Sequence, residues 1–128
     1  MDHEFLHIEP PRSLTSEEEG ILHHLLSINF QGRDELLKQA QSARVVEECK
    51  ECPSIAILVD KIPEHSAPVK HRVPIQAQTV DSDGVVMHVL LHVVHGFIDE
   101  IEIYRVDLQS VKKLPQPNSL EFMELDSN

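Results

Sequence analysis

The chain has few of the residues that mark several common functional classes. Its 128 residues include no tryptophan, one tyrosine, four glycines and two cysteines. Four glycines leave no glycine-rich loop to hold a phosphate, and no serine lies in a Gly-x-Ser-x-Gly nucleophile elbow. These absences weigh against an enzyme, although real enzymes can lack both motifs.

Basic residues are also scarce. Eleven Lys and Arg stand against 22 Asp and Glu, which gives a formal net charge of −11. A negative surface repels nucleic acid phosphates and anionic lipid headgroups, so we expect neither nucleic acid nor membrane binding. The same charge would attract a basic protein partner or would serve solubility alone.

Long apolar segments are missing as well. No run approaches the roughly 18 apolar residues of a membrane-spanning helix, and no charged-then-apolar leader opens the chain. Two cysteines in a chain of this length do not resemble the disulfide scaffold of a small secreted domain. We therefore expect a cytoplasmic protein.

The length suits one domain with a single core. We expect residues 1–12 to form an N-terminal tail or a short edge strand, which ends at Pro10-Pro11. The domain itself should span residues 13–117. Residues 118–128 are acidic and should form a loose C-terminal tail.

Two helices are expected near the start of the domain. Thr15 stands three residues before Glu18, the spacing of a capping box, and predicts a helix over residues 16–27. A second, more polar helix is expected over residues 33–42.

From Ala43 onward the pattern favours strands. We expect strands over residues 44–49, 54–60 and 73–80, followed by the two arms of a hairpin within 85–105. The fold class is therefore α+β, with two N-terminal helices packed on one face of a mostly antiparallel sheet of about five strands. Apolar positions between residues 108 and 114 indicate a weaker sixth element.

The hairpin carries the clearest alternation. The odd positions are apolar from Val85 to Val93 on the first arm and at Ile101 and Ile103 on the second, which predicts that they face the core. A three-residue loop 94–96 would place Val89 opposite Ile101 and His88 opposite Glu102. We reject a two-residue turn at His95-Gly96 because it would bury glutamates.

The even positions of the hairpin form a mixed polar and apolar face, which we predict to be an interaction surface for a basic partner or a second copy of the chain. A His88–Glu102 acid–base pair, as in a small hydrolase or isomerase, is an alternative. Histidines four apart on a strand lie about 13 Å apart, so they cannot share a metal ion. The predicted interaction face consists of His88, Leu90, His92, Glu100, Glu102 and Tyr104.

Cys49 and Cys52 form a C-x-x-C pair, which can be structural, redox-active or a zinc ligand pair. Pro53 follows the pair, where a metal knuckle favours a glycine, and a strand-forming run replaces the helix of redox sites. We expect two structural thiols and no metal or cofactor. A zinc-binding or thiol-dependent protein is the alternative function.

Several short segments together resemble a family of small bacterial proteins of unknown function, over residues 12–120. The resemblance implies no activity, cofactor or site. With the charge and the mixed strand face, we predict a non-enzymatic interaction module, in one version the neutraliser of a basic toxin. The segments are Arg12-x-Leu14-Thr15-x-x-Glu18, Phe30-x-Gly32, Cys49-x-x-Cys52-Pro53-Ser54-Ile55, Leu91-His92-Val93 with Gly96, Glu100-x-Glu102-x-Tyr104 and Leu114-Pro115-x-Pro117.

Overall fold

The computed structural model describes residues 4–123, which form one antiparallel sheet and two helices. The elements are β1 (Phe5–Ser13), α1 (Ser16–Leu25), α2 (Arg33–Ala40), β2 (Arg44–Cys49), β3 (Ile55–Leu58), the 3₁₀ turn η1 (Pro63–His65), β4 (Ile75–Val80), β5 (Val86–Val94), β6 (Phe97–Arg105), the 3₁₀ turn η2 (Pro117–Ser119) and β7 (Glu121–Phe122).

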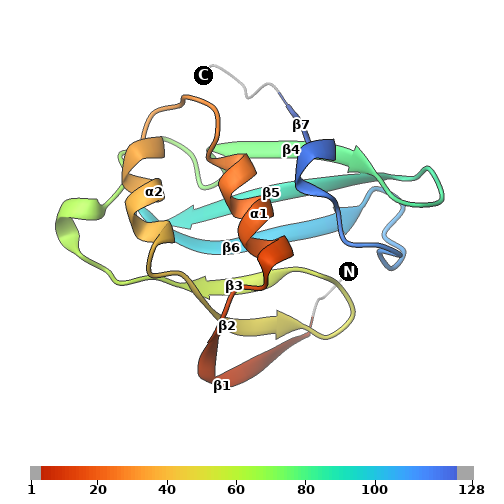
Figure 1. Cartoon of the computed structure of the whole chain (residues 1–128), viewed down its shortest axis with the longest axis horizontal. Helices are drawn as coiled ribbons and strands as arrows, with labels where there is room; N and C mark the ends of the chain where they lie inside the picture. The colour runs from red at the N-terminus through yellow and green to blue at the C-terminus, as the bar shows by residue number, and fades with distance from the viewer. Residues whose placement is uncertain (1–3, 124–128) are drawn as a thin grey trace.

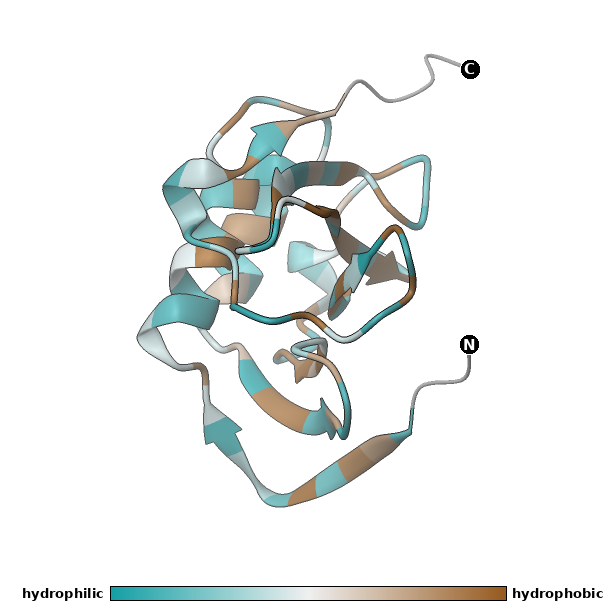
Figure 2. Cartoon of the chain, turned by 90° about the vertical axis from the view of Figure 1, so that its right-hand side faces the viewer, coloured by the Kyte–Doolittle hydropathy of each residue, from teal (hydrophilic) through white to brown (hydrophobic). Residues whose placement is uncertain are grey.

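The seven strands lie in the order β1-β2-β3-β6-β5-β4-β7. Both helices lie in front of the sheet in Figure 1, and Figure 2, turned by 90°, shows them again on one side of it. The fold is therefore a two-layer α+β domain, which confirms the predicted class.

Two details of that prediction are wrong. The sheet has seven strands instead of about five, because β1 extends one of its edges and the two-residue β7 extends the other. The helices also do not come first in the chain, since β1 precedes them and pairs with β2. Thus residues 5–12, for which we expected a tail or a short edge strand, lie in an edge strand. Of the expected C-terminal tail, residues 121–122 pair with β4, and residues 124–128 lie outside the described part.

The core lies between the helices and one face of the sheet. On β5, and on β6 from Ile101 onward, the odd-numbered apolar side chains are buried, as the alternation predicted. Closer to the turn the parity of β6 is reversed, and Ile98 is buried instead of Phe97. Leu22 and Leu25 of α1 and Leu36 of α2 cover them and are at most 1% exposed. The strand residues of this layer include Ile55, Ile57, Ile75, Val89, Leu91, Ile101 and Ile103.

The register of the β5–β6 hairpin differs from the prediction. Val94 pairs with Phe97, so His95-Gly96 is the two-residue turn that we had rejected. Both residues have positive φ, 53° and 86°, as a type I′ turn requires. The register then shifts, which makes Asp99 an extra residue in β6.

This bulge restores the pairing of odd with odd positions. Beyond it, Leu91 lies opposite Ile101 and Val89 opposite Ile103. The expected pairs Val89–Ile101 and His88–Glu102 are therefore wrong by two residues, since Val89 pairs with Ile103 and His88 with Tyr104. Our rejection of the short turn assumed an unbroken ladder, and a bulge removes that premise.

The start of α1 forms as predicted. The Thr15 side chain accepts a hydrogen bond from the Glu18 backbone N–H, and the Glu18 carboxylate accepts one from the Thr15 N–H. The helix ends at Leu25, two residues before the expected end at Ser27.

Gln39 fixes α2 to the hairpin turn. Its side chain is buried, and its amide nitrogen, Nε2, donates to the carbonyls of His65 and Gly96. Its Oε1 accepts from the Ile98 N–H at 2.8 Å. Three segments distant in sequence are thus held by one amide.

Arg105 fixes the end of β6 to the turn after β4. Its buried guanidinium lies 3.1 Å from the Asp81 carboxylate and 3.0 Å from that of Asp83. The Asp81 carboxylate also accepts the backbone N–H groups of Lys112 and Lys113. We call residues 106–116 the strap, because these bonds hold this irregular segment across the end of the sheet. The strap replaces the expected sixth element, since it contains no helix or strand.

Candidate functional site

The second face of the sheet is the candidate site. No helix covers it within residues 4–123, because both helices lie on the core side. Its side chains are half-buried by their neighbours on the sheet instead of by a second layer. The structure places every residue of the predicted interaction face here, namely His88, Leu90, His92, Glu100, Glu102 and Tyr104. We call this surface the open face.

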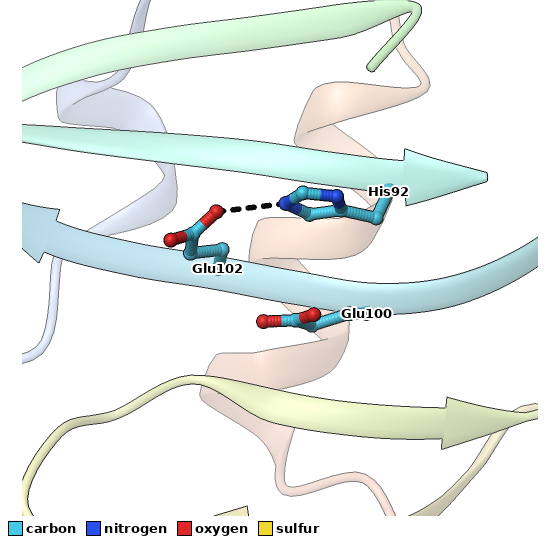
Figure 3. Close-up of side chains that lie close together, drawn as sticks. All are labelled: His92, Glu100 and Glu102. Carbon is cyan, nitrogen blue, oxygen red and sulfur yellow. Dashed lines mark hydrogen bonds and ion pairs between the residues drawn. The ribbon is translucent and has the colours of Figure 1, made fainter. Parts of the chain in front are cut away.

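A cluster of three side chains lies at the centre of the open face. His92 of β5 points toward Glu102 of β6, and its Nε2 lies 2.8 Å from a Glu102 carboxylate oxygen. Glu100, directly opposite His92, completes the group. Figure 3 shows all three projecting from the side of the strands away from the helical ribbon.

The cluster corrects the predicted His88–Glu102 pair. His88 lies opposite Tyr104, and their rings stack with centroids 5.4 Å apart. Glu102 instead bonds to His92, which lies diagonally across the hairpin. The two-residue difference in register is the reason, because it places Glu102 opposite Leu90 instead of His88.

Arg72 sets the direction of the hydrogen bonds. Its Nε, which always carries a hydrogen, donates to Nδ1 of His92 at 2.9 Å. Nδ1 therefore accepts, and the imidazole hydrogen sits on Nε2, from which it is donated to Glu102. A second nitrogen of Arg72 lies 3.7 Å from the Asp99 carboxylate. Arg72, His92 and Glu102 thus form a continuous donor chain.

Glu100 is left out of that chain. Its carboxylate accepts no hydrogen bond from any residue that the structure describes. Burial raises the pKa of Glu100 above its ordinary value, and the nearby Glu102 and Asp99 carboxylates add to this change. His92 and Arg72 oppose it but do not cancel it. Its ionised form is therefore poorly compensated in the protein alone.

The cluster contains metal-ligand atoms, since those of His92, Glu100 and Glu102 all lie within 4.8 Å of one another. The hydrogen-bond directions oppose a metal ion, however. A metal at Nε2 would displace the hydrogen given to Glu102, and the imidazole would then carry it on Nδ1, against the Arg72 donor. Metal-binding histidines instead give that hydrogen to an acceptor. The cluster is better suited to hold a cationic group beside Glu100.

Cys49 and Cys52 are joined by a disulfide. In this state neither sulfur is a thiolate, so a zinc ion could bind there only after reduction. Disulfides persist mainly in oxidising compartments. This removes one of the supports for the expected cytoplasmic location, which stays a prediction.

A cavity of about 400 Å³ lies beside the open face, between the Cys49–Cys52 loop and the strap. Glu102 and Tyr104 belong both to its wall and to the open face. The remaining wall consists of Glu51, Cys52, Ile103, Arg105, Leu108, Gln109, Ser110 and Val111.

Sequence reasoning missed Arg72, Asp99 and the cavity. Arg72 and Asp99 reach the cluster through a long loop and a bulge, neither of which has a reliable local signal. One signal did exist at Arg105: it continues the inward odd positions, and a buried guanidinium requires carboxylate partners.

The chain matches the family described as Domain of unknown function (DUF6984) over residues 11–115, and it belongs to that family. This confirms the predicted family of unknown function, while its bacterial origin stays a prediction. No curated protein and no solved structure matches the chain. No helix in the described residues has the length and apolar character needed to cross a membrane.

Proposed function

We propose that this member of the DUF6984 family is a non-enzymatic interaction module that binds a basic protein segment on the open face. The observation that carries the proposal is Glu100, a half-buried carboxylate with a raised pKa and no hydrogen-bond donor of its own among the described residues. Such a group gains from a cation that arrives with a partner.

The charge of the molecule supports a basic occupant. The chain carries a formal net charge of −11, and the open face adds Glu47 of β2 to Glu100 and Glu102. Opposite charge accelerates encounter with a basic partner and adds specificity. A second copy of the chain would bring the same carboxylates against one another, so we do not favour the homodimer.

The apolar members of the face supply contact area. Leu90 lies opposite Glu102, and Ala56 of β3 lies opposite Glu100, so apolar side chains alternate with the acids. Tyr104 adds an aromatic ring held against His88. Aromatic and apolar anchors surrounded by charge are typical of protein interfaces.

The test uses a fluorescent nona-arginine peptide and anisotropy titrations at low and high salt. Binding should weaken as salt rises. In the variant Glu100→Gln/Glu102→Gln the affinity should fall by roughly tenfold, since two exposed charge pairs together contribute about 1.4 kcal/mol. The matched control, Glu17→Gln/Glu64→Gln, removes two exposed charges elsewhere and should bind almost as the wild type does.

Three results would overturn the proposal. They are no binding at low salt, an equal loss in the test and control variants, and a solution mass that shows dimers formed through the open face. Sedimentation of the wild type and the double variant supplies that mass.

A further inference from the structure

The cavity beside the open face has features of a ligand site. Its volume of about 400 Å³ lies within the range of small-molecule sites. Its wall combines carboxylates and a phenol with aliphatic side chains, the mixture that orients an amphipathic ligand.

The charge of the wall selects a cation. Glu51 and Glu102 contribute carboxylates, and Tyr104 contributes a hydroxyl. Arg105 is the cation among the described lining residues, but Asp81, Asp83 and Asp107 surround its guanidinium at 2.8 to 3.1 Å. The group as a whole is therefore negative, and nothing in the wall neutralises Glu51.

The strap contributes the apolar part. Leu108 and Val111 line the cavity, and Leu108 is 53% exposed although it is a large apolar residue. Leu108 also has a φ of 62°, a left-handed conformation that costs a leucine about 1 to 2 kcal/mol. Backbone strain of this kind clusters at active sites and ligand clamps.

From these features we infer that the cavity receives a guanidinium group on an aliphatic chain, the side chain of an arginine in the basic partner; this inference rests on the proposed function. The planar donor fork of guanidinium matches a carboxylate and packs on an aromatic ring, which an ammonium does less well. Glu102 connects the two regions, because it bonds to His92 on the open face and lines the cavity.

The experiment compares two small probes by amide chemical-shift titration of the intact chain. They are n-butylguanidinium and its uncharged counterpart of similar shape, n-butylurea. We expect saturable shifts at the cavity residues with the guanidinium and none with the urea. The variants Glu51→Gln and Glu102→Gln should each weaken binding several-fold, whereas the control Glu64→Gln should not.

A second variant separates the cavity from general electrostatics. Ser110→Phe changes an exposed wall residue and leaves every charge in place. This variant should abolish the chemical-shift changes caused by n-butylguanidinium and should weaken binding of the nona-arginine peptide. If the probe binds Ser110→Phe as well as the wild type, or if butylurea binds equally, the inference is overturned. n-Pentylammonium binding more tightly than n-butylguanidinium would overturn the choice of arginine.

The two proposals fail in different ways. Peptide binding that depends on Glu100 but not on Glu51 or Ser110, with no probe binding, would remove the cavity inference alone. Saturable probe binding without peptide binding would remove the proposed function and show instead a site for a free small cation.

Discussion

At Glu100 the protein holds a carboxylate where its surroundings favour the protonated form. Burial raises its pKa, and the acids at positions 99 and 102 act in the same direction. Glu102, two residues away on the same strand, has a hydrogen-bond donor within the protein, the His92 ring. Both glutamates point to the same face of β6, but of the two carboxylates only that of Glu102 is hydrogen-bonded to another described residue. The position of the His92 ring sets this difference.

We predict that Glu100→Gln stabilises the fold at neutral pH. Because the pKa of Glu100 is raised in the folded state, its contribution to stability is fully present below the ordinary value of 4.5 and is lost as pH rises through the raised value. Glutamine stays neutral and avoids that loss. The gain should be less than about 1 kcal/mol, since solvent screens a half-exposed group.

Urea unfolding of both proteins at neutral pH and below pH 4.5 measures this difference. The variant should be more stable at neutral pH and equal to the wild type in acid. Glu64→Gln, which removes an exposed charge, is the control. A variant that is less stable than the wild type at neutral pH would contradict our account of Glu100.

At the scale of helices and strands, the sequence predicts the features whose pattern lies within a few neighbouring residues. The Thr15–Glu18 cap and the inward odd positions of β5 are local patterns, and both are confirmed. The bulge at Asp99 is not visible in the alternation, because its effect is to restore the parity that an ordinary three-residue loop would also give. The short strand β7 pairs with β4 over two residues, too few for any period to be read.

The turn of the hairpin gives a test at this scale. His95 has a φ of 53°, a region that asparagine adopts more readily than histidine. We predict that His95→Asn stabilises the protein by up to about 1 kcal/mol, part of the cost of a left-handed residue. The matched variant His95→Val should destabilise it, since branching at Cβ disfavours positive φ.

Thermal unfolding of the two variants against the wild type reports both effects. If both variants shift the midpoint of thermal unfolding in the same direction, His95 does not lie in a type I′ turn.

At the scale of the molecule, the Arg105 group connects parts that no local pattern relates. It joins β6, the turn after β4 and the strap, and the strap in turn forms one wall of the cavity. No sequence pattern pairs Asp81 with Arg105, because 24 residues separate the two. The proposed cation site therefore depends on a buried ion-pair network that tertiary structure alone reveals.

This network makes a prediction about acid. A hydrogen bond from Arg105, helped by the Gln109 N–H, lowers the pKa of Asp107 from 3.8 to about 2. For a carboxyl with a lowered pKa, the stabilising contribution is present above the ordinary value and is lost as pH falls through the folded value. The Asp107 bond should therefore persist below pH 3.8 and break near pH 2. We predict that Asp107→Asn, which lacks this contribution, loses less stability than the wild type between those two values.

Two measurements test the network together. Urea unfolding across that pH window compares the wild type with Asp107→Asn and with the control Asp60→Asn, an exposed aspartate outside the group. Hydrogen exchange of the Lys112 and Lys113 amides, both bonded to Asp81, reports on the strap itself. Exchange at these amides should be faster in Asp107→Asn than in the wild type, because one of the three carboxylates that hold Arg105 in place is gone. Parallel unfolding curves for Asp107→Asn and the wild type, with unchanged exchange, would show that the strap is held without Asp107 and that the cavity wall does not depend on it.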